Sequence, residues 1–447
     1  MAGLNRIKFQ LCMSGAAMNK TTHRILKGLC YCFAILFCVF ILGWQIFIYQ
    51  TEKIDLAALP VLPTCVSTID SVYLNQINRS RNIAQSLMQL RQIPGLTIAV
   101  SHNGNLIWSE GFGWADTEQK ITACPKHQFR LASVSKLLTA AGMAKLVEQH
   151  RLDLDADIRV YVPEFPDKGS PITARQLAGH QSGIRHYRDD QEAVETKHYR
   201  GVIASLDKFK DDSLLFKPGT AFHYSSYGYV LLSAVIERSA GKDFLVFMQD
   251  EIFTPLHMFA TAAADTAGAY AYQTKFYDNV TPYSWDGSIV ESPYADFSYK
   301  WAGGGFLSTV EDLVKFGNAH IPVLHAGFLK NETPQLLFEK GTMPDFIPGI
   351  GLGWMIARDP YLRKVCLHFG AGSGATSFLA IYPEEKLSLA ILANLGHAKF
   401  TYEHLIGIAN PFLDDSIKAY LILFDFLIIL IASAFIWGKV RKRSQSK

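Results

Sequence analysis

The chain has 447 residues, of which 49% are hydrophobic and 19% are charged, and its formal net charge is +3. This length and apolar content predict a large folded core and exclude a disordered chain. The central region has no basic stripe interleaved with aromatic residues, which excludes nucleic acid as a partner.

The first predicted element is a membrane-spanning helix over residues 29–49. Its sequence, LCYCFAILFCVFILGWQIFIY, has Gln45 as its only strongly polar interruption and is long enough to cross a hydrocarbon layer of ~30 Å. Residues 1–28 contain basic residues and no acid, which predicts a cytoplasmic N-terminal segment. A cleaved signal peptide and a mitochondrial transit segment remain as alternatives.

Residues 50–69 are interpreted as a linker, and residues 70–400 as one folded domain. The domain is predicted to begin with an amphipathic helix over residues 71–92. The apolar positions of this helix include Val72, Ile77, Ile83, Leu87 and Leu90.

Two β-rich blocks flank a mainly helical middle. The first, GLTIAVSHNGNLIWSEGFGWAD, has a strand on each side of Asn103-Gly104, a strong hairpin signal. The second, FLAIYPEEKLSLAILANL, has two strands joined by residues 383–385. We therefore expect one antiparallel sheet assembled from both ends of the domain, with an inserted helical subdomain and a cleft at their seam.

The helical middle has recognisable periodic segments. SKLLTAAGMAKLVEQH and YGYVLLSAVIERSAGKDFLVFMQDEIF have helical apolar spacing, and Ser308 with Glu311 predicts a capping box. Three cysteines lie in the body of the chain, Cys65, Cys124 and Cys366, so one disulfide is allowed without a preferred pairing. No ligand spacing for a metal appears, and no cofactor is implied.

A second membrane-spanning helix is predicted over residues 419–438, after a linker at 401–418. It contains Asp425 toward its N-terminal end and is followed by a basic tail at 439–447. Basic residues beyond both spans predict that both termini are cytoplasmic and that the domain is extracytoplasmic, in the periplasm, at the cell exterior or in the mitochondrial intermembrane space. A packed hydrophobic C-terminal helix is the alternative.

The stretch RLASVSK places Ser133 and Lys136 three residues apart at the start of a helix. At this spacing an amine can reach the hydroxyl, and the helix N-terminus offers N–H groups to a developing oxyanion. Two later stretches add to this pattern in order: Tyr224-Ser-Ser226, and His368-Phe-Gly370 in CLHFGAGSGATSFLAIYP.

The ordered set SVSK, YSS and HFG resembles the penicillin-recognising serine hydrolases. It is most similar to the branch that holds class C β-lactamases, D-stereospecific peptidases and esterases, and within it to the serine β-lactamase-like proteins of mitochondria and bacteria. The longer stretches FRLASVSKLLTAAGMAKLVEQHRLDLDADIRVYVPEFPDK and WAGGGFLSTVEDLVKF also carry this resemblance. It implies an α/β (α+β) domain of the β-lactamase/transpeptidase-like fold, here flanked by the two predicted transmembrane helices.

The resemblance also implies a role for each motif residue. Ser133 would be the nucleophile, Lys136 its activating amine, and Tyr224 the base and later the acid. The backbone N–H groups of Ser133 and Ala371 would form the oxyanion hole. The substrate-binding residues would be Ser226, His368 and Gly370.

Two departures from the family pattern bear on the substrate. Ser226 stands where the family often has asparagine, which removes an amide donor. His368 stands where β-lactamases carry lysine, and a histidine is mostly uncharged near neutral pH. We therefore expect β-lactam turnover to be slow and incidental.

Other motifs receive structural interpretations. His180, with Ser182-Gly183, is predicted to form a turn, as is the segment 217–219. The glycines at 303–305 are predicted to allow close backbone approach rather than nucleotide binding.

The leading prediction is a membrane-anchored serine hydrolase that forms an acyl-enzyme with a small peptide, amide or ester. One alternative is a D-Ala-D-Ala carboxypeptidase or β-lactamase. Another is a filament-forming membrane scaffold with a retained hydrolase site. For the leading prediction, the partners of the protein would be the substrate and the lipid bilayer. The sequence does not decide whether the protein forms a homo-oligomer.

Overall fold

The computed structural model describes residues 62–264, 279–324, 327–330, 332–339 and 349–413. They belong to one compact unit, Asp55–Asp414. The predicted spans at 29–49 and 419–438 lie outside the described residues. Within the described ranges, no helix combines the length and apolar character that a bilayer crossing needs.

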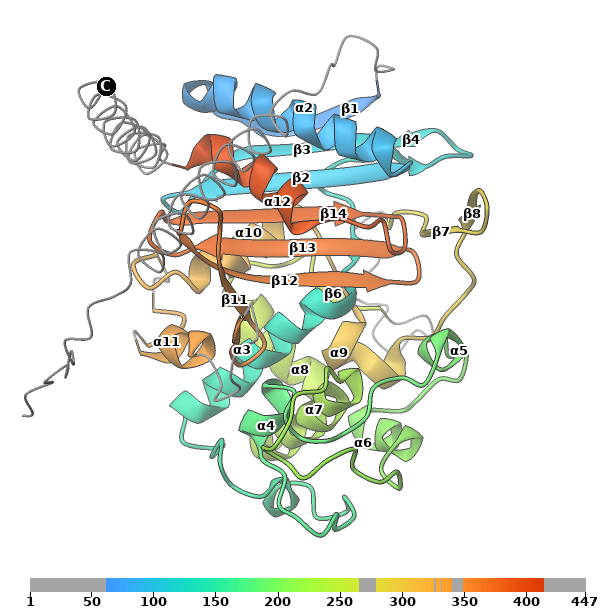
Figure 1. Cartoon of the computed structure of the whole chain (residues 1–447), viewed down its shortest axis with the longest axis vertical. Coiled ribbons are helices and arrows are strands. Elements are labelled where there is room, and N and C mark those ends of the chain that lie inside the picture. The colour runs from blue at the N-terminus through green and yellow to red at the C-terminus, as the bar shows by residue number, and fades with distance from the viewer. Residues whose placement is uncertain (1–61, 265–278, 325–326, 331, 340–348, 414–447) are drawn as a thin grey trace, which may run out of the picture. The chain divides into compact units, whose positions relative to one another are not determined.

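A nine-stranded antiparallel sheet forms the first layer of this unit, and Figure 1 shows its long central strands. The order along its main path is β1-β3-β2-β14-β13-β12-β11-β10, with β4 paired to β3. The bounds are β1 Thr64–Ile69, β2 Gly95–His102, β3 Asn105–Asp116, β4 Ile121–Thr122, β10 Gly349–Ile350, β11 Met355–Arg358, β12 Lys364–Gly372, β13 Ala375–Tyr382 and β14 Leu387–Ala393.

The two ends of the domain meet in the middle of the sheet, as predicted. Strand β2 pairs with β14 in antiparallel register, with Ala99 opposite Ala390. The predicted hairpin joins β2 to β3, because Asn103 and Gly104 have φ values of 52° and 81° and so form the left-handed turn that this dipeptide favours. All residues of β13 and β14 are buried, so the centre of the sheet is covered on both faces.

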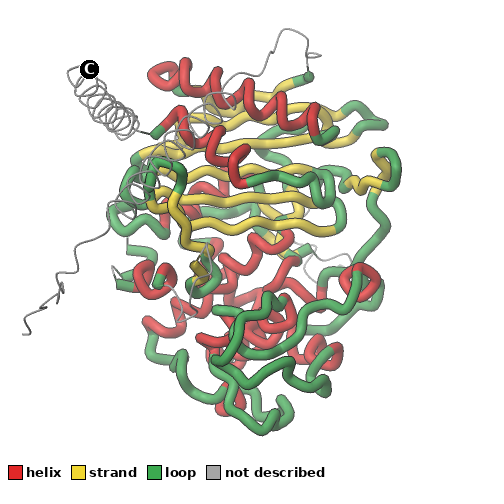
Figure 2. The backbone as a smooth tube through the Cα atoms, in the orientation of Figure 1, coloured by secondary structure: helices red, strands yellow, loops and turns green. Residues whose placement is uncertain are grey.

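Helices cover both faces of the sheet. On one face lie α2 (Leu74–Leu90) and α12 (Tyr402–Ala409), which also contact each other (Figure 1). On the other face α10 (Val310–Ala319) packs against β14 and β2. Figure 2 shows the strands gathered in one half of the unit and most helices in the other half.

The helical half is the inserted subdomain that the sequence predicts. Its longest helices, α3 (Ser135–Glu148) and α7 (Ser226–Ala240), contact each other. Its other helices are α4 Ala174–Ala178, α5 Asp190–Ala193, α6 Val202–Ser205, α8 Phe244–Met248, α9 Trp301–Gly304 and α11 Thr333–Phe338. Short strands complete it: β5 Phe129–Arg130, β6 Ala262–Ala263 and β9 Phe306–Ser308 in one sheet, and β7 Tyr283–Trp285 with β8 Ile289–Glu291 in another.

The structure corrects the boundaries expected for the folded domain. The compact unit extends on both sides of residues 70–400, because β1 pairs with β3 and α12 packs on α2. A disulfide joins Cys65 of β1 to Cys124 after β4, and Cys366 is a buried free thiol. Parts of the segments interpreted as linkers, 50–69 and 401–418, are therefore structural.

Details of the predicted helices also change. Thr309, not Ser308, caps α10, since its side chain accepts the hydrogen bond from the Asp312 amide. The long apolar segment after Tyr224 is broken at Gly241, whose φ of 59° ends α7. In the first amphipathic segment, Val72 and Leu90 are exposed rather than packed in the core.

Candidate active site

The predicted nucleophile lies in a single 3-10 turn, Ala132–Val134, just before α3. Ala132 has a φ of 44°, a left-handed conformation that a residue with a Cβ rarely adopts and that stores strain. This turn follows β5, whose pairing with β9 fixes its path. Ser133 is thereby held at the junction of the sheet and the helical subdomain.

Lys136 is fully buried on the first turn of α3, with its amine next to Ser133. The Lys136 Nζ lies 3.1 Å from Ser133 Oγ, 3.0 Å from Ser226 Oγ and 2.5 Å from the Gly303 carbonyl oxygen. Burial, and then the charge of Lys300, lower the pKa of Lys136 well below its ordinary value. The amine can therefore be neutral when it faces the hydroxyl.

Tyr224 approaches Ser133 from the opposite segment. Its phenol donates a hydrogen bond of 2.7 Å to Ser133 Oγ. Burial raises the pKa of Tyr224 above its ordinary value, so this phenol holds its proton at neutral pH. A protonated phenol here can donate to a leaving group, and the order of base and acid roles that the resemblance implies stays a prediction.

The YSS segment is held by two histidines. Ser225 caps α7 by accepting a hydrogen bond from the Gly228 amide, and its own amide donates to His180 Nδ1. The Ser226 amide donates to His186 Nδ1. His180 has a φ of 59° and packs against Tyr224, with ring centroids 4.4 Å apart, so it supports the phenol as the predicted turn residue.

Strand β12 passes directly beside the nucleophile turn. A Cβ on Gly370 would lie 2.3 Å from the Leu131 carbonyl oxygen and 3.0 Å from the Ser133 nitrogen, so only glycine fits there. Strand β11 pairs with β12 only as far as Leu367, which leaves the edge at Gly370 and Ala371 open toward this turn. The backbone of Ala371 therefore reaches the same region as Ser133.

His368 lies near Tyr224. Its side chain is buried, Nδ1 lies 2.6 Å from the Phe369 carbonyl oxygen, and its ring centroid is 6.3 Å from that of Tyr224. Burial lowers the pKa of His368 to about 3, so the imidazole is neutral. Neither His368 nor Gly370 is among the residues that line the cavity described below, and their contact with a substrate stays a prediction.

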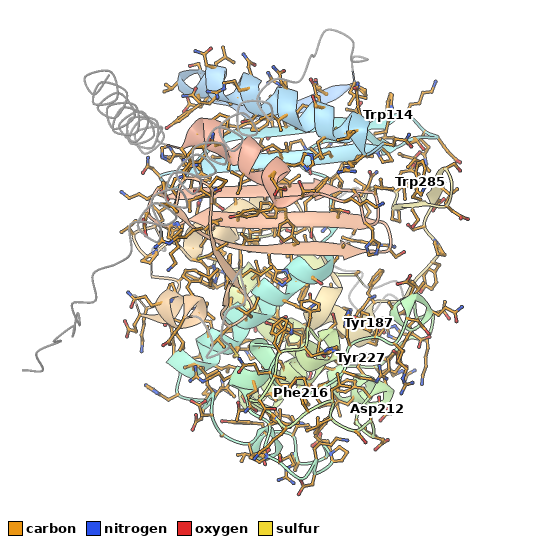
Figure 3. The ribbon with its side chains drawn as sticks, in the orientation of Figure 1. Trp114, Tyr187, Asp212, Phe216, Tyr227 and Trp285 are labelled. Atoms are coloured by element: carbon orange, nitrogen blue, oxygen red, sulfur yellow. A yellow bond between two sulfur atoms is a disulfide. The ribbon has the colours of Figure 1, made fainter. Side chains whose placement is uncertain are left out.

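A cavity of about 790 Å³ opens at the seam between the sheet and the helical subdomain. Ser133, Ser226 and Ala371 line its inner wall, while Tyr187 and Trp285 come from opposite sides. In Figure 3, Tyr187 belongs to the helical part and Trp285 to the β7–β8 hairpin. Three of the predicted site residues thus face a space large enough for a small substrate.

Sequence reasoning did not find two cations in this cavity, the buried Lys300 and the partly buried Arg130. Arg130 is three residues before Ser133, and Lys300 immediately precedes α9. Neither belongs to a motif with a spacing rule. A lysine three residues before a run of glycines carries no signal until the fold is known.

Two other interpretations agree with the structure. Residues 217–220 form a turn closed by the Thr220 amide on the Lys217 carbonyl oxygen. Gly303 approaches the backbone of α7 closely, since a Cβ there would lie 3.0 Å from the Ser226 carbonyl oxygen.

The fold and the contact of Ser133 with an amine and a phenol define a serine hydrolase of the acyl-transferring type. The chain belongs to the beta-lactamase family, whose model, described as Beta-lactamase, matches residues 81–408.

One relative agrees with this assignment, and two solved structures share the fold. The mitochondrial serine beta-lactamase-like protein LACTB of Homo sapiens is 32% identical over 404 residues, covering 70% of this chain and 73% of the relative. The octameric penicillin-binding protein homologue from Pyrococcus abyssi has a TM-score of 0.66 at 24% identity, covering 75% and 76% of the two chains. The D-amino acid amidase from Ochrobactrum anthropi has a TM-score of 0.63 at 24% identity, covering 76% and 96%.

Proposed function

We propose that this serine hydrolase cleaves small peptides, amides or esters through an acyl-enzyme on Ser133. The carrying observation is that Ser133 Oγ lies within hydrogen-bond distance of both the Lys136 amine, at 3.1 Å, and the Tyr224 phenol, at 2.7 Å. Similarity in fold to an amidase supports the amide class of substrate.

In the first step, Ser133 Oγ attacks the substrate carbonyl and its proton passes to the neutral Lys136 amine. The developing oxyanion accepts hydrogen bonds from the backbone amides of Ser133 and Ala371. As the bond to the leaving group breaks, Tyr224 gives its proton to the departing amine or alcohol. The proton on Lys136 then restores the phenol, so that no net charge accumulates.

In the second step, water attacks the acyl carbon. The same amine accepts a proton from that water and returns it to Ser133 Oγ as the acid product leaves. Every group in this cycle is already on one wall of the cavity or directly behind it. The reaction therefore needs no additional protein group.

β-Lactam turnover would be a minor activity in this account. The neutral His368 offers no fixed charge to a penicillin carboxylate, and it lies outside the cavity lining. Ser226 also lacks the amide donor that the family often has at this position.

We place the domain outside the cytoplasm, anchored by helices at 29–49 and 419–438, with 1–28 and 439–447 on the cytoplasmic side. The Cys65–Cys124 disulfide supports an oxidising compartment. The human relative is named as mitochondrial, which favours the intermembrane space if this chain is mitochondrial. Carbonate extraction followed by protease protection tests the topology: release of the chain by carbonate would contradict the anchors.

The catalytic proposal is tested with a fluorophosphonate probe and intact-mass spectrometry. We expect one adduct, mapped to Ser133 by peptide sequencing, and none in a folded Ser133→Ala variant. A panel of D- and L-peptide amides, esters and β-lactams then ranks the substrates. Folded wild-type protein without an adduct would refute the proposal.

A further inference from the structure

Two cationic side chains face the cavity without an acidic partner. Arg130 donates a hydrogen bond of 3.1 Å to the Ser373 carbonyl oxygen, and the Lys300 amine donates one of 2.6 Å to the Ala193 carbonyl oxygen. Among the ion pairs between described residues, none includes either side chain. Lys300 is buried and Arg130 is partly buried, and withdrawing a cation from water without a carboxylate is costly, which indicates that a partner arrives from outside.

Arg130 and Lys300 both pack against the same aromatic side chain. Arg130 Cζ and Lys300 Nζ each lie 4.8 Å from the centre of the Phe297 ring, so one ring positions both. Lys300 also lies 5.4 Å from the ring of Tyr187, which lines the same cavity. The same aromatic ring therefore contacts both cations, and all three side chains line the cavity.

The neighbouring charged side chains do not neutralise Arg130 and Lys300. The charged neighbours that act on Lys300 are Arg130 and Lys208, and with burial they lower the pKa of Lys300 to about 7. Burial alone lowers the pKa of Arg130, to about 10. The charged side chains of the cavity lining, apart from histidine, are Arg91, Arg130, Lys300 and Lys399 against the single acid Asp190. A cleft of one sign concentrates ligands of the other sign.

We infer that Arg130 and Lys300 form a subsite for a carboxylate of the substrate, so that the preferred acyl donors are anionic. The inference rests on the proposed function, since the carboxylate would belong to the molecule that acylates Ser133. Arg130 can bind a carboxylate through two parallel N–H groups, and Lys300 adds a point charge. This subsite lies at β5 and the start of α9, whereas His368 lies on β12 and does not line the cavity.

Reversible boronic acids test this inference on the folded chain. They add to the serine hydroxyl, and matched pairs differ only in charge: 3- and 4-carboxyphenylboronic acid against the corresponding carboxamides. At pH 6.5 we expect at least one acid to inhibit or bind about 10-fold more tightly than its amide.

The variants locate the effect. Lys300→Met should bring the acid-to-amide ratio close to one, and Arg130→Gln should lower it in part. Lys145→Met, which removes a lysine from the far end of α3, should leave the ratio unchanged. Lys300→Gln, which keeps a donor for the Ala193 carbonyl oxygen, replaces Lys300→Met if that variant does not fold.

The outcomes separate the two proposals. Equal affinity within each pair, or a preference that survives both Lys300 and Arg130 substitutions, would overturn the carboxylate subsite alone. Failure of all four compounds to form an adduct with folded protein would remove the acyl-enzyme proposal, and the subsite with it.

Discussion

The Lys136 amine has three close oxygen neighbours, and a neutral amine has two hydrogens and one lone pair. The Gly303 carbonyl oxygen can only accept, so it takes one hydrogen, and Ser226 Oγ can take the other. The lone pair then faces Ser133, whose hydroxyl becomes the donor. This count of hydrogens and acceptors explains how the lone pair of a buried lysine is directed at Ser133 without any further residue.

A Tyr224→Phe substitution isolates the phenol. It keeps the ring that packs on His180 and removes the hydrogen bond to Ser133 Oγ. We expect turnover of amides to fall by about 100-fold, and of aryl esters by less, because a good leaving group needs no proton.

Tyr229→Phe is the matched control for this variant, since it loses a buried hydroxyl that donates to the Ala178 carbonyl oxygen. Steady-state kinetics with an anilide and an aryl ester of the same acyl group provide the measurement. An equal loss for both substrates would contradict the proton-donor role.

Acid should destabilise the fold through its buried histidines. Burial lowers the pKa of His368 to about 3 and that of His186 to about 4, whereas both titrate near 6.5 when unfolded. Between these values the unfolded chain binds the extra protons, so the free energy of unfolding falls as pH drops below about 6.5. The slope is at most about 1.4 kcal/mol per pH unit for each histidine.

Denaturant unfolding at several pH values tests this expectation. His368→Asn should flatten the acid limb relative to wild type, while a substitution of an exposed histidine, His150→Asn, should not. An unchanged slope in His368→Asn would contradict the role assigned to burial.

At the scale of elements, the close passage of β12 beside the nucleophile turn is a specific constraint. In Gly370→Ala the new Cβ would meet Ser377 Oγ at 2.1 Å and the Leu131 carbonyl oxygen at 2.3 Å. We expect a loss of at least about 1–3 kcal/mol in unfolding free energy, together with slower acylation as the turn moves.

Gly372→Ala, two residues along the same strand, is the control, because its Cβ would meet only the Ala132 Cβ at 3.7 Å. Melting temperature and probe labelling are measured for both variants. A Gly370→Ala protein as stable and reactive as wild type would contradict the predicted clash.

The elements found from sequence are those with local signals. The Asn-Gly turn fixes the β2–β3 hairpin, and the three-residue spacing of Ser133 and Lys136 lies within one helical turn. The cap of α10 was misplaced by one residue because Ser308 and Thr309 are both suitable hydroxyls. Arg130 and Lys300 come together only through tertiary packing on Phe297, which no local pattern encodes.

At the scale of the whole molecule, the sheet closes the fold by joining its two ends. Strand β1 and helix α12 extend the domain beyond the predicted 70–400, because β1 pairs with β3 and α12 packs on α2. Both partners are distant in sequence, so no local pattern reveals these contacts. A sequence pattern predicts a strand or a helix, but it does not predict which other element that strand or helix will pack against.

The disulfide should matter for stability and not for chemistry. It links two segments 59 residues apart at the β1 edge of the sheet. Cys65→Ala/Cys124→Ala should lower the free energy of unfolding by about 2–4 kcal/mol and leave acylation unchanged.

Reductant provides the internal control. It should lower the melting temperature of wild type and of Cys366→Ala, but not that of the double variant. A double variant as stable as wild type would show that the bridge does not constrain the fold.

The most direct test of the central claim is the second-order rate constant for fluorophosphonate labelling of Ser133 in wild type, Lys136→Met and Lys145→Met. We predict a fall of about 100-fold or more in Lys136→Met with no loss of melting temperature, because methionine fills the buried site without a charge, and no change in Lys145→Met. Labelling of Lys136→Met at the wild-type rate would contradict the claim that a neutral lysine activates the hydroxyl.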